Sequence, residues 1–424
     1  MPAQPSGRPP ATLTGSEARA ANHRAVLDLL RRGDAMTRAQ LSRETGLSRS
    51  TISRLVAGLA DRGLVSEDQV HHGAGAGRPA TLLRLNRRVG VAVGVDAGVE
   101  HVGVLVGDLS RRVRVERWHH LPSDMGGGAR QAVLLRAVRD AVAEAGINPG
   151  ELVGAGVSVA APVSSTSGEV TDPKVLPWWE EARVAEALTS HFGIPVVQDN
   201  DANLGALAEL TWGARAGTRN MVYLKAASRI GAGIVIDGSV YRGPSGYAGE
   251  IGHSVVEPGG RLCWCGERGC LELYAGGAAI LADLAARHRP LAGIADLAAA
   301  ARAGDAQVAA VLGRAGRALG RALRTTAVLL SPREIVVGGE LSALGDALLG
   351  PIRTELATIP GGRRVGVTVS SLGERASLWG ALALVSAEAT SFSREHRWRH
   401  PGIAAGAVSE EDGGEQNSLI MTTY

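Results

Sequence analysis

Tyr247 to Glu272 reads YAGEIGHSVVEPGGRLCWCGERGCLE, and this stretch holds all three cysteines of the chain. The thiols of Cys263, Cys265 and Cys270 form an odd, tightly clustered set, which does not suit a disulfide framework. His253 precedes the first of them by ten residues, so one imidazole and three thiolates make a four-ligand set. Such a set suits tetrahedral, structural zinc. The alternative is three buried free thiols beside a core histidine.

On both sides of this stretch, short Val, Ile and Leu runs alternate with longer Ala, Leu and Arg segments, which predicts an α/β fold. Strands are expected within residues 91–98, 152–162, 194–201, 221–228, 334–341 and 365–371. Helices are expected at 127–146, 201–210, 276–288, 295–305 and 304–329. The sequence shows no convincing internal repeat.

The segment 22–66 has the pattern of a helix-turn-helix, which begins with an apolar scaffold helix ended by a glycine. Thr37 and Gln40 fit a capping box, Gly46 permits a tight turn, and Ser48 can cap the next helix. That helix buries apolar residues on one face and presents short polar and guanidinium groups on the other, as a recognition helix does. The predicted DNA-contacting residues are Arg49, Ser50, Thr51, Ser53 and Arg54.

Two strand-like segments, LVSED (64–68) and ATLLRLN (80–86), follow this helix and are joined by a glycine-rich loop that ends in Gly-Arg-Pro. This order predicts a wing, and Arg78 beside the glycine and proline is expected to enter a narrow minor groove. The alternative is a protein-interaction or dimerisation module with a solvated basic face.

GEIGH (249–253) followed by CWCGERGCLE (263–272) resembles the signature of the ROK family, which contains repressors and sugar kinases. The resemblance runs from about residue 22 to about residue 390. It implies a two-lobed, actin-like (ribonuclease-H-like) α/β fold behind the winged helix-turn-helix. It also implies that His253, Cys263, Cys265 and Cys270 hold zinc.

QDNDANLGALAE (198–209) resembles the family's N-D-A-N motif at the end of a predicted strand. In family kinases the residue matching Asp201 is the general base toward the sugar hydroxyl, and the resemblance places Asn200, Glu250, His253 and Glu272 at the sugar. Carboxylates and amides suit several neighbouring hydroxyls. The alternative is structural: Asp201 caps a helix, Glu250 is exposed and Glu272 forms a salt bridge.

The two phosphate loops of family kinases are altered in this sequence. Where those kinases show D-x-G-G-T, residues 96–100 read DAGVE, and where they show G-T-G-I-G-G-G, residues 227–233 read ASRIGAG. Phosphoryl transfer needs backbone amides that approach the nucleotide's phosphates closely, so the chain is expected to be no enzyme, with Asp201 a vestigial base. Two alternatives are an active ATP-dependent sugar kinase that also binds DNA, and a constitutive DNA-binding protein with a dimerisation scaffold.

The expected domains are a disordered tail (1–20), a winged helix-turn-helix (21–87), a ROK sugar-sensing domain (88–390) whose zinc loop spans 253–270, and a second disordered tail (391–424). The 424 residues carry a formal net charge of +3 and lack an apolar run of membrane-spanning length or a secretory signal. We therefore expect a cytoplasmic transcriptional regulator with no membrane contact. Its expected partners are double-stranded operator DNA, a sugar or sugar-phosphate effector, and further copies of itself in a homodimer or homotetramer.

Overall fold

The computed structural model describes residues 22, 25–27, 29–30, 35–61, 65–70, 80–85, 90–108, 112–172, 175–213, 218–359 and 364–388. The two predicted tails and the loop that carries Arg78 lie outside these residues. Among the described helices, none is both long and apolar enough to cross a lipid bilayer.

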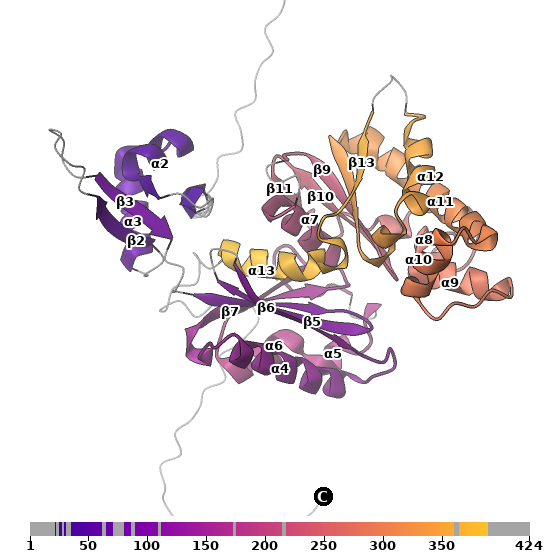
Figure 1. Cartoon of the computed structure of the whole chain (residues 1–424), viewed down its shortest axis with the longest axis horizontal. Coiled ribbons are helices and arrows are strands. Elements are labelled where there is room, and N and C mark those ends of the chain that lie inside the picture. The colour runs from indigo at the N-terminus through magenta and orange to yellow at the C-terminus, as the bar shows by residue number, and fades with distance from the viewer. Residues whose placement is uncertain are drawn as a thin grey trace, which may run out of the picture.

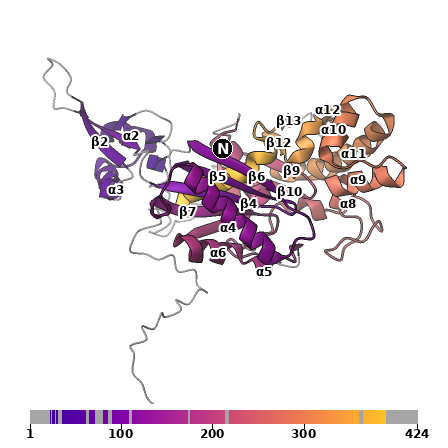
Figure 2. The same cartoon turned by 60° about the horizontal axis from the view of Figure 1, so that its bottom comes forward.

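The N-terminal module is a helix-turn-helix with a wing, and it stands at one end of the molecule (Figures 1 and 2). Its capping box is present, since the Thr37 amide donates to Gln40 Oε1 at 2.7 Å and the Gln40 amide donates to Thr37 Oγ1 at 3.2 Å. Gly46, at φ 73°, ends the first of the two helices. The antiparallel pairing of β2 with β3 confirms the predicted wing strands. The elements are β1 (Met36–Thr37), α2 (Arg38–Thr45), α3 (Arg49–Asp61), β2 (Val65–Val70) and β3 (Ala80–Leu85).

The first lobe is a five-stranded sheet in the order β6-β5-β4-β7-β8, in which β5 is antiparallel to both neighbours and β4, β7 and β8 are parallel. Helices α4, α5 and α6 cover one face of it (Figure 1), over a core that includes Val93, Val95 and Val157. The elements are β4 (Val91–Ala97), β5 (His101–Asp108), β6 (Val113–His120), α4 (Gly127–Glu144), η1 (Pro149–Glu151), β7 (Leu152–Val159), α5 (Trp179–Ala182), α6 (Val184–Phe192) and β8 (Val196–Asn200).

The second lobe repeats this topology with the order β11-β10-β9-β12-β13 and the same strand directions. Its outer face is covered by α9 to α12, whose apolar residues join those of β9 in one core. The elements are β9 (Met221–Ala226), β10 (Ile230–Ile236), β11 (Ser239–Tyr241), η3 (Ile251–His253), α8 (Glu272–Ala275), α9 (Gly277–Ala286), α10 (Ile294–Arg302), α11 (Ala306–Leu330), β12 (Glu334–Gly338), η4 (Glu340–Leu344), α12 (Asp346–Leu356), β13 (Gly366–Val369) and η6 (Gly373–Arg375).

Two helices exchange sides between the lobes. α7 (Asp201–Thr211) follows the last strand of the first lobe and packs on the second sheet, whereas α13 (Ala376–Glu388) follows the second lobe and packs on the first sheet. Figure 1 shows α13, in yellow, between the first sheet and α7. The duplicated sheets and the crossed helices confirm the expected two-lobed architecture, and they place the end of β8 and the start of α7 between the lobes.

Each of the predicted strands and helices has a counterpart, but several elements were not predicted. The unpredicted elements include β5, β6, β10, β11, α6, α12 and α13. Strand β10 was read only as a phosphate loop, and α13 is buried among both lobes, so it has little of the amphipathic contrast that identifies a surface helix. The repeat between the lobes is likewise one of topology rather than of sequence.

Candidate functional site

The four predicted metal ligands come together. The ligand atoms of His253, Cys263, Cys265 and Cys270 all lie within 4.8 Å of one another. His253 Nδ1 is 3.7 Å from Cys263 Sγ, and Cys265 Sγ is 3.7 Å from Cys270 Sγ. Two thiolates that each lie about 2.3 Å from a tetrahedral zinc ion are about 3.8 Å apart. The donor set therefore has the spacing of a closed, four-coordinate metal site.

Burial and crowding keep the thiols of Cys263 and Cys270 neutral in the absence of a bound cation. Burial, followed by contacts with Cys265 and Cys263, raises the pKa of Cys270 to about 12. The pKa of Cys263 is also raised, mainly by burial. Thiols crowded in this way do not ionise by themselves, and a metal ion supplies the positive charge that thiolates need.

Glycine builds the loop that carries these ligands. Gly269 has φ 84°, and a Cβ there would lie 1.8 Å from the carbonyl oxygen of Glu257. Gly266 has φ 93° and closes a turn in which its amide donates to Cys263 O at 3.0 Å. Only glycine adopts such conformations without strain, so the spacing of the cysteines is tied to these two positions.

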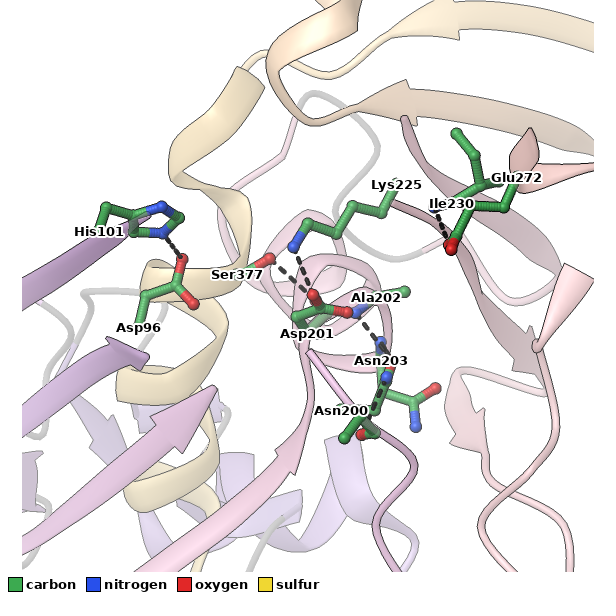
Figure 3. Close-up of polar contacts among 11 residues, drawn as sticks. Asp96, His101, Asn200, Asp201, Ala202, Asn203, Lys225, Ile230, Glu272 and Ser377 are labelled. Carbon is green, nitrogen blue, oxygen red and sulfur yellow. Dashed lines mark hydrogen bonds and ion pairs between the residues drawn. The ribbon is translucent and has the colours of Figure 1, made fainter. Parts of the chain in front are cut away.

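Asn200 and Asp201 lie at the junction of β8 and α7, as expected. Asn200, not Asp201, caps the helix: its Oδ1 accepts from the amides of Ala202 at 2.9 Å and Asn203 at 3.2 Å. Its Nδ2 donates to Ala161 O at 3.2 Å. The carboxylate of Asp201 is paired instead with the ammonium group of Lys225 on β9 (Figure 3).

Glu250 lies within electrostatic range of both Asp201 and Glu272. Burial, with repulsion from Asp201 and Glu272, raises the pKa of Glu250 to about 7, against an opposing effect of Arg229. Glu250 is half-buried, so the exposed alternative does not describe it. Glu272 accepts from the Ile230 amide at 3.2 Å and from Trp264 Nε1 at 3.3 Å. These two bonds join the metal loop to the start of β10.

In the two segments compared with phosphate loops, side chains of the protein make contacts of their own. His101 Nε2 lies 3.1 Å from Asp96 Oδ2, and a Cβ at Gly98 would lie 2.3 Å from the His101 ring. Arg229 in the second loop donates to Val175 O of the first lobe at 2.9 Å, and its guanidinium lies 5.8 Å from the Trp264 ring centroid. Arg229 therefore reaches across the lobes.

Sequence reasoning missed three charged residues at this site: His101, Lys225 and Arg242. The guanidinium of Arg242 lies 2.6 Å from Asp199 Oδ2 and joins the second lobe to the buried end of β8. One signal was available, because Lys225 is one of only two lysines in the chain and interrupts an otherwise apolar strand. The contacts of His101 and Arg242 depend on strand pairing, so no pattern in the sequence indicates them.

The helix α3 has the faces expected of a recognition helix. Ile52, Leu55, Val56 and Leu59 are buried, and Ser48 Oγ caps the helix by accepting from the Thr51 amide at 3.1 Å. Thr51 is half-buried, and its hydroxyl contacts Ser48 Oγ at 2.8 Å. The exposed predicted residues are Arg49, Ser50, Ser53 and Arg54.

Comparisons with known proteins agree with this arrangement. The ROK family model matches residues 92–388, and the HVO_A0261 N-terminal domain model matches residues 13–78. A xylose repressor of Bacillus spizizenii is 29% identical over 367 residues, covering 86% of this chain and 94% of that protein. The DNA-binding transcriptional dual regulator NagC of Escherichia coli K12 is 29% identical over 349 residues, covering 80% and 84%.

The crystal structure of a ROK family transcriptional regulator, a homolog of the E. coli MLC protein, has the same fold. It aligns with a TM-score of 0.74 at 24% identity and covers 88% of this chain and 98% of that chain. Because the family model spans more than half of the sequence, the chain belongs to the ROK family.

Proposed function

We propose that this chain is a sequence-specific DNA-binding transcriptional repressor of carbohydrate genes, controlled by a sugar or sugar derivative and without kinase activity. The observation that carries the proposal is the joining of α3, which exposes two arginines and two serines from one face, to a pair of ROK lobes. Relatives named as a xylose repressor and as NagC, which match over both parts of the chain, support it. The functional units proposed are residues 21–87 for DNA and 88–390 for the effector.

In this proposal α3 lies in the major groove of operator DNA. Arg49 and Arg54 reach base edges or phosphates, Ser50 and Ser53 add short polar contacts, and Arg78 on the wing enters the minor groove. A homodimer or homotetramer presents two such modules to two half-sites. Closure of the lobes on the effector changes their relative placement.

The effector site is assigned to Asn200, Asp201, Glu250, His253 and Glu272. Asp201 and Glu272 both raise the pKa of Glu250, which supports a common polar space for the three carboxylates. Carboxylates in one polar space match the vicinal hydroxyls of a sugar, and ligands that lack a hydroxyl leave such groups unpaired.

Zinc is the metal that we assign to His253, Cys263, Cys265 and Cys270. When bound, the ion holds the loop that joins Glu250 to Glu272, and because four protein ligands fill its coordination shell it is structural. Cys265→Ser is expected to lower zinc affinity about 100-fold or more, measured by zinc content after dialysis. Unchanged zinc content would refute the ligand assignment, and Ser254→Ala is the matched control beside the ligands.

The central experiment measures DNA binding by fluorescence anisotropy, with duplexes from the region upstream of the chain's own gene. Arg49→Ala and Arg54→Ala are each expected to cost about 1–3 kcal/mol of binding free energy. Arg302→Ala, an exposed helix arginine in the second lobe, is the control and should have no effect. D-xylose, D-glucose, N-acetylglucosamine and their phosphates are then added to find the effector that releases the DNA.

Two outcomes would replace this proposal. ATP-dependent phosphorylation of a hexose that is abolished by Asp201→Asn would make the chain a kinase that also binds DNA. Strong operator binding that no sugar or sugar phosphate alters, with no sugar binding by calorimetry, would make the lobes a dimerisation scaffold.

A further inference from the structure

Two carboxylates and two cationic side chains meet where the lobes face each other (Figure 3). Asp96 comes from the end of β4 and Asp201 from the start of α7, whereas Lys225 extends from β9 of the second lobe. The His101 ring lies beside Asp96 and over Gly98. Each carboxylate therefore has its own cation, supplied by the protein.

These pairs are shielded from water. The side chains of Asp96 and Asp201 are 6% and 10% exposed, and that of Lys225 is 18% exposed. Burial disfavours a charge on Lys225, but the carboxylates of Asp201, Asp96 and Glu340 outweigh it and raise its pKa. The pKa of His101 is likewise raised against burial, by its contact with Asp96. His101 thus acts as a cation toward Asp96, and Lys225 acts as a cation toward both Asp201 and Asp96.

A sugar kinase of this architecture would need a divalent metal ion at this place. Phosphoryl transfer uses a divalent ion to hold nucleotide phosphates, and such ions bind carboxylate oxygens. Carboxylates that are shielded from water attract such an ion, whereas the ammonium group of Lys225, which is paired with Asp201 and also attracted by Asp96, repels it. The ammonium group of lysine is also more compact than the planar guanidinium of arginine. Lys225 is notable for this reason, because nearly every other basic residue of this chain is arginine.

We propose that Lys225 and His101 are resident counter-ions that take the place of a divalent cation between Asp96 and Asp201. The space between the lobes then admits an effector without metal-bound nucleotide. The inference deepens the proposed function, on which it rests, by naming residues that convert a phosphotransfer site into a binding site. Replacing both cations should open a divalent metal site that the wild-type protein lacks.

The test uses Mn²⁺ on zinc-loaded, full-length protein, with free Mn²⁺ measured by electron paramagnetic resonance. Mn²⁺ prefers oxygen ligands, so it reports on the carboxylates rather than on the cysteines. The double variant Lys225→Met/His101→Gln is expected to gain one Mn²⁺ site at least ~10-fold tighter than any site in the wild type, or about 1.4 kcal/mol. Adding Asp96→Asn should remove this site, and Lys225→Arg alone should not create it.

Zinc content and melting temperature establish that each variant is folded, and Lys225→Gln alone carries the test if the double variant is not. Wild-type protein that binds Mn²⁺ in an Asp96-dependent way would overturn the proposal. A folded variant that gains no Mn²⁺ site would overturn it equally. Neither result depends on DNA or sugar binding, so a failure here is separable from a failure of the proposed function.

Discussion

The two lobes share one strand order, yet each accommodates its inner helix in the opposite way. In the first lobe the sheet supplies the glycines: Gly94 and Gly156 are paired across β4 and β7, and a Cβ at Gly156 would lie 2.1 Å from Ala381 O of α13. In the second lobe the corresponding pair is Tyr223 and Val336, and at this position the glycine lies in the helix, although Gly233 of β10 also approaches α7 closely, with a Cβ that would lie 2.4 Å from Ala202 O. A Cβ at Gly205 of α7 would lie 2.2 Å from the Tyr223 ring.

This difference shows that topology determines where a helix must lie and sequence determines which partner makes room. The contact across the first sheet is backbone against backbone, which cannot give way. The contact at Gly205 in the second lobe is backbone against an aromatic ring, which can shift at a cost. The two lobes should therefore respond unequally to the same substitution.

Gly156→Ala should have the largest effect, because the new methyl group meets the α13 backbone. We expect it to cost about 3 kcal/mol or more of unfolding free energy, seen as a lower melting temperature. Gly313→Ala in α11 is the matched control, since its Cβ would meet only Arg317 Nη1 at 3.4 Å. The control should be neutral or gain about 0.5–1 kcal/mol. Equal melting temperatures for the two variants would show that α13 does not press on this sheet.

Gly205→Ala should have a smaller effect, about 1–3 kcal/mol, because the Tyr223 ring can be displaced. Making the same substitution in a Tyr223→Leu background sharpens the comparison. If the ring is the obstacle, the alanine should cost much less in the Tyr223→Leu background, which a double-mutant cycle in thermal unfolding measures. Additive costs would place the obstacle elsewhere.

The smallest effect concerns the charged ends of the corresponding strands. Asp96 and Lys225 are the penultimate residues of β4 and β9, so one lobe offers a carboxylate where the other offers an ammonium group. Burial opposes both charges of the Asp96–His101 pair, but their mutual contact prevails: it raises the pKa of His101 and lowers that of Asp96.

Because the folded pKa of His101 is raised, the stability it contributes is complete below the unfolded pKa of about 6.5 and is lost as pH rises through the folded value. Asp96 sets the lower pH limit of this stabilisation. Because its pKa is lowered in the folded state, it contributes stability above about pH 4 that is lost in stronger acid. The advantage of wild type over His101→Gln should be about 1 kcal/mol at pH 5.5 and should shrink at pH 8.5. An advantage independent of pH would mean that the ring acts only by packing over Gly98.

Much of this arrangement was predictable. The capping box at Thr37, the turn at Gly46 and the alternating strands follow from local rules that act within a few residues. The metal cluster was also visible, since its three cysteines lie within eight residues. The pairing of Asp201 with Lys225 was not predictable, because the residues come from different lobes. The structural alternative gave the capping role to Asp201 rather than to Asn200, because sequence alone does not distinguish adjacent polar residues.

The sequence by itself determined the family signature, the donor set for a metal and the buried and exposed faces of α3, because each depends on residue type and short spacing. The tertiary structure alone decided that two sheets repeat one topology, that their inner helices are exchanged, and that Lys225 and His101 neutralise the carboxylates between them. These features depend on strand pairing and helix crossing, where burial and charge act through space rather than along the chain.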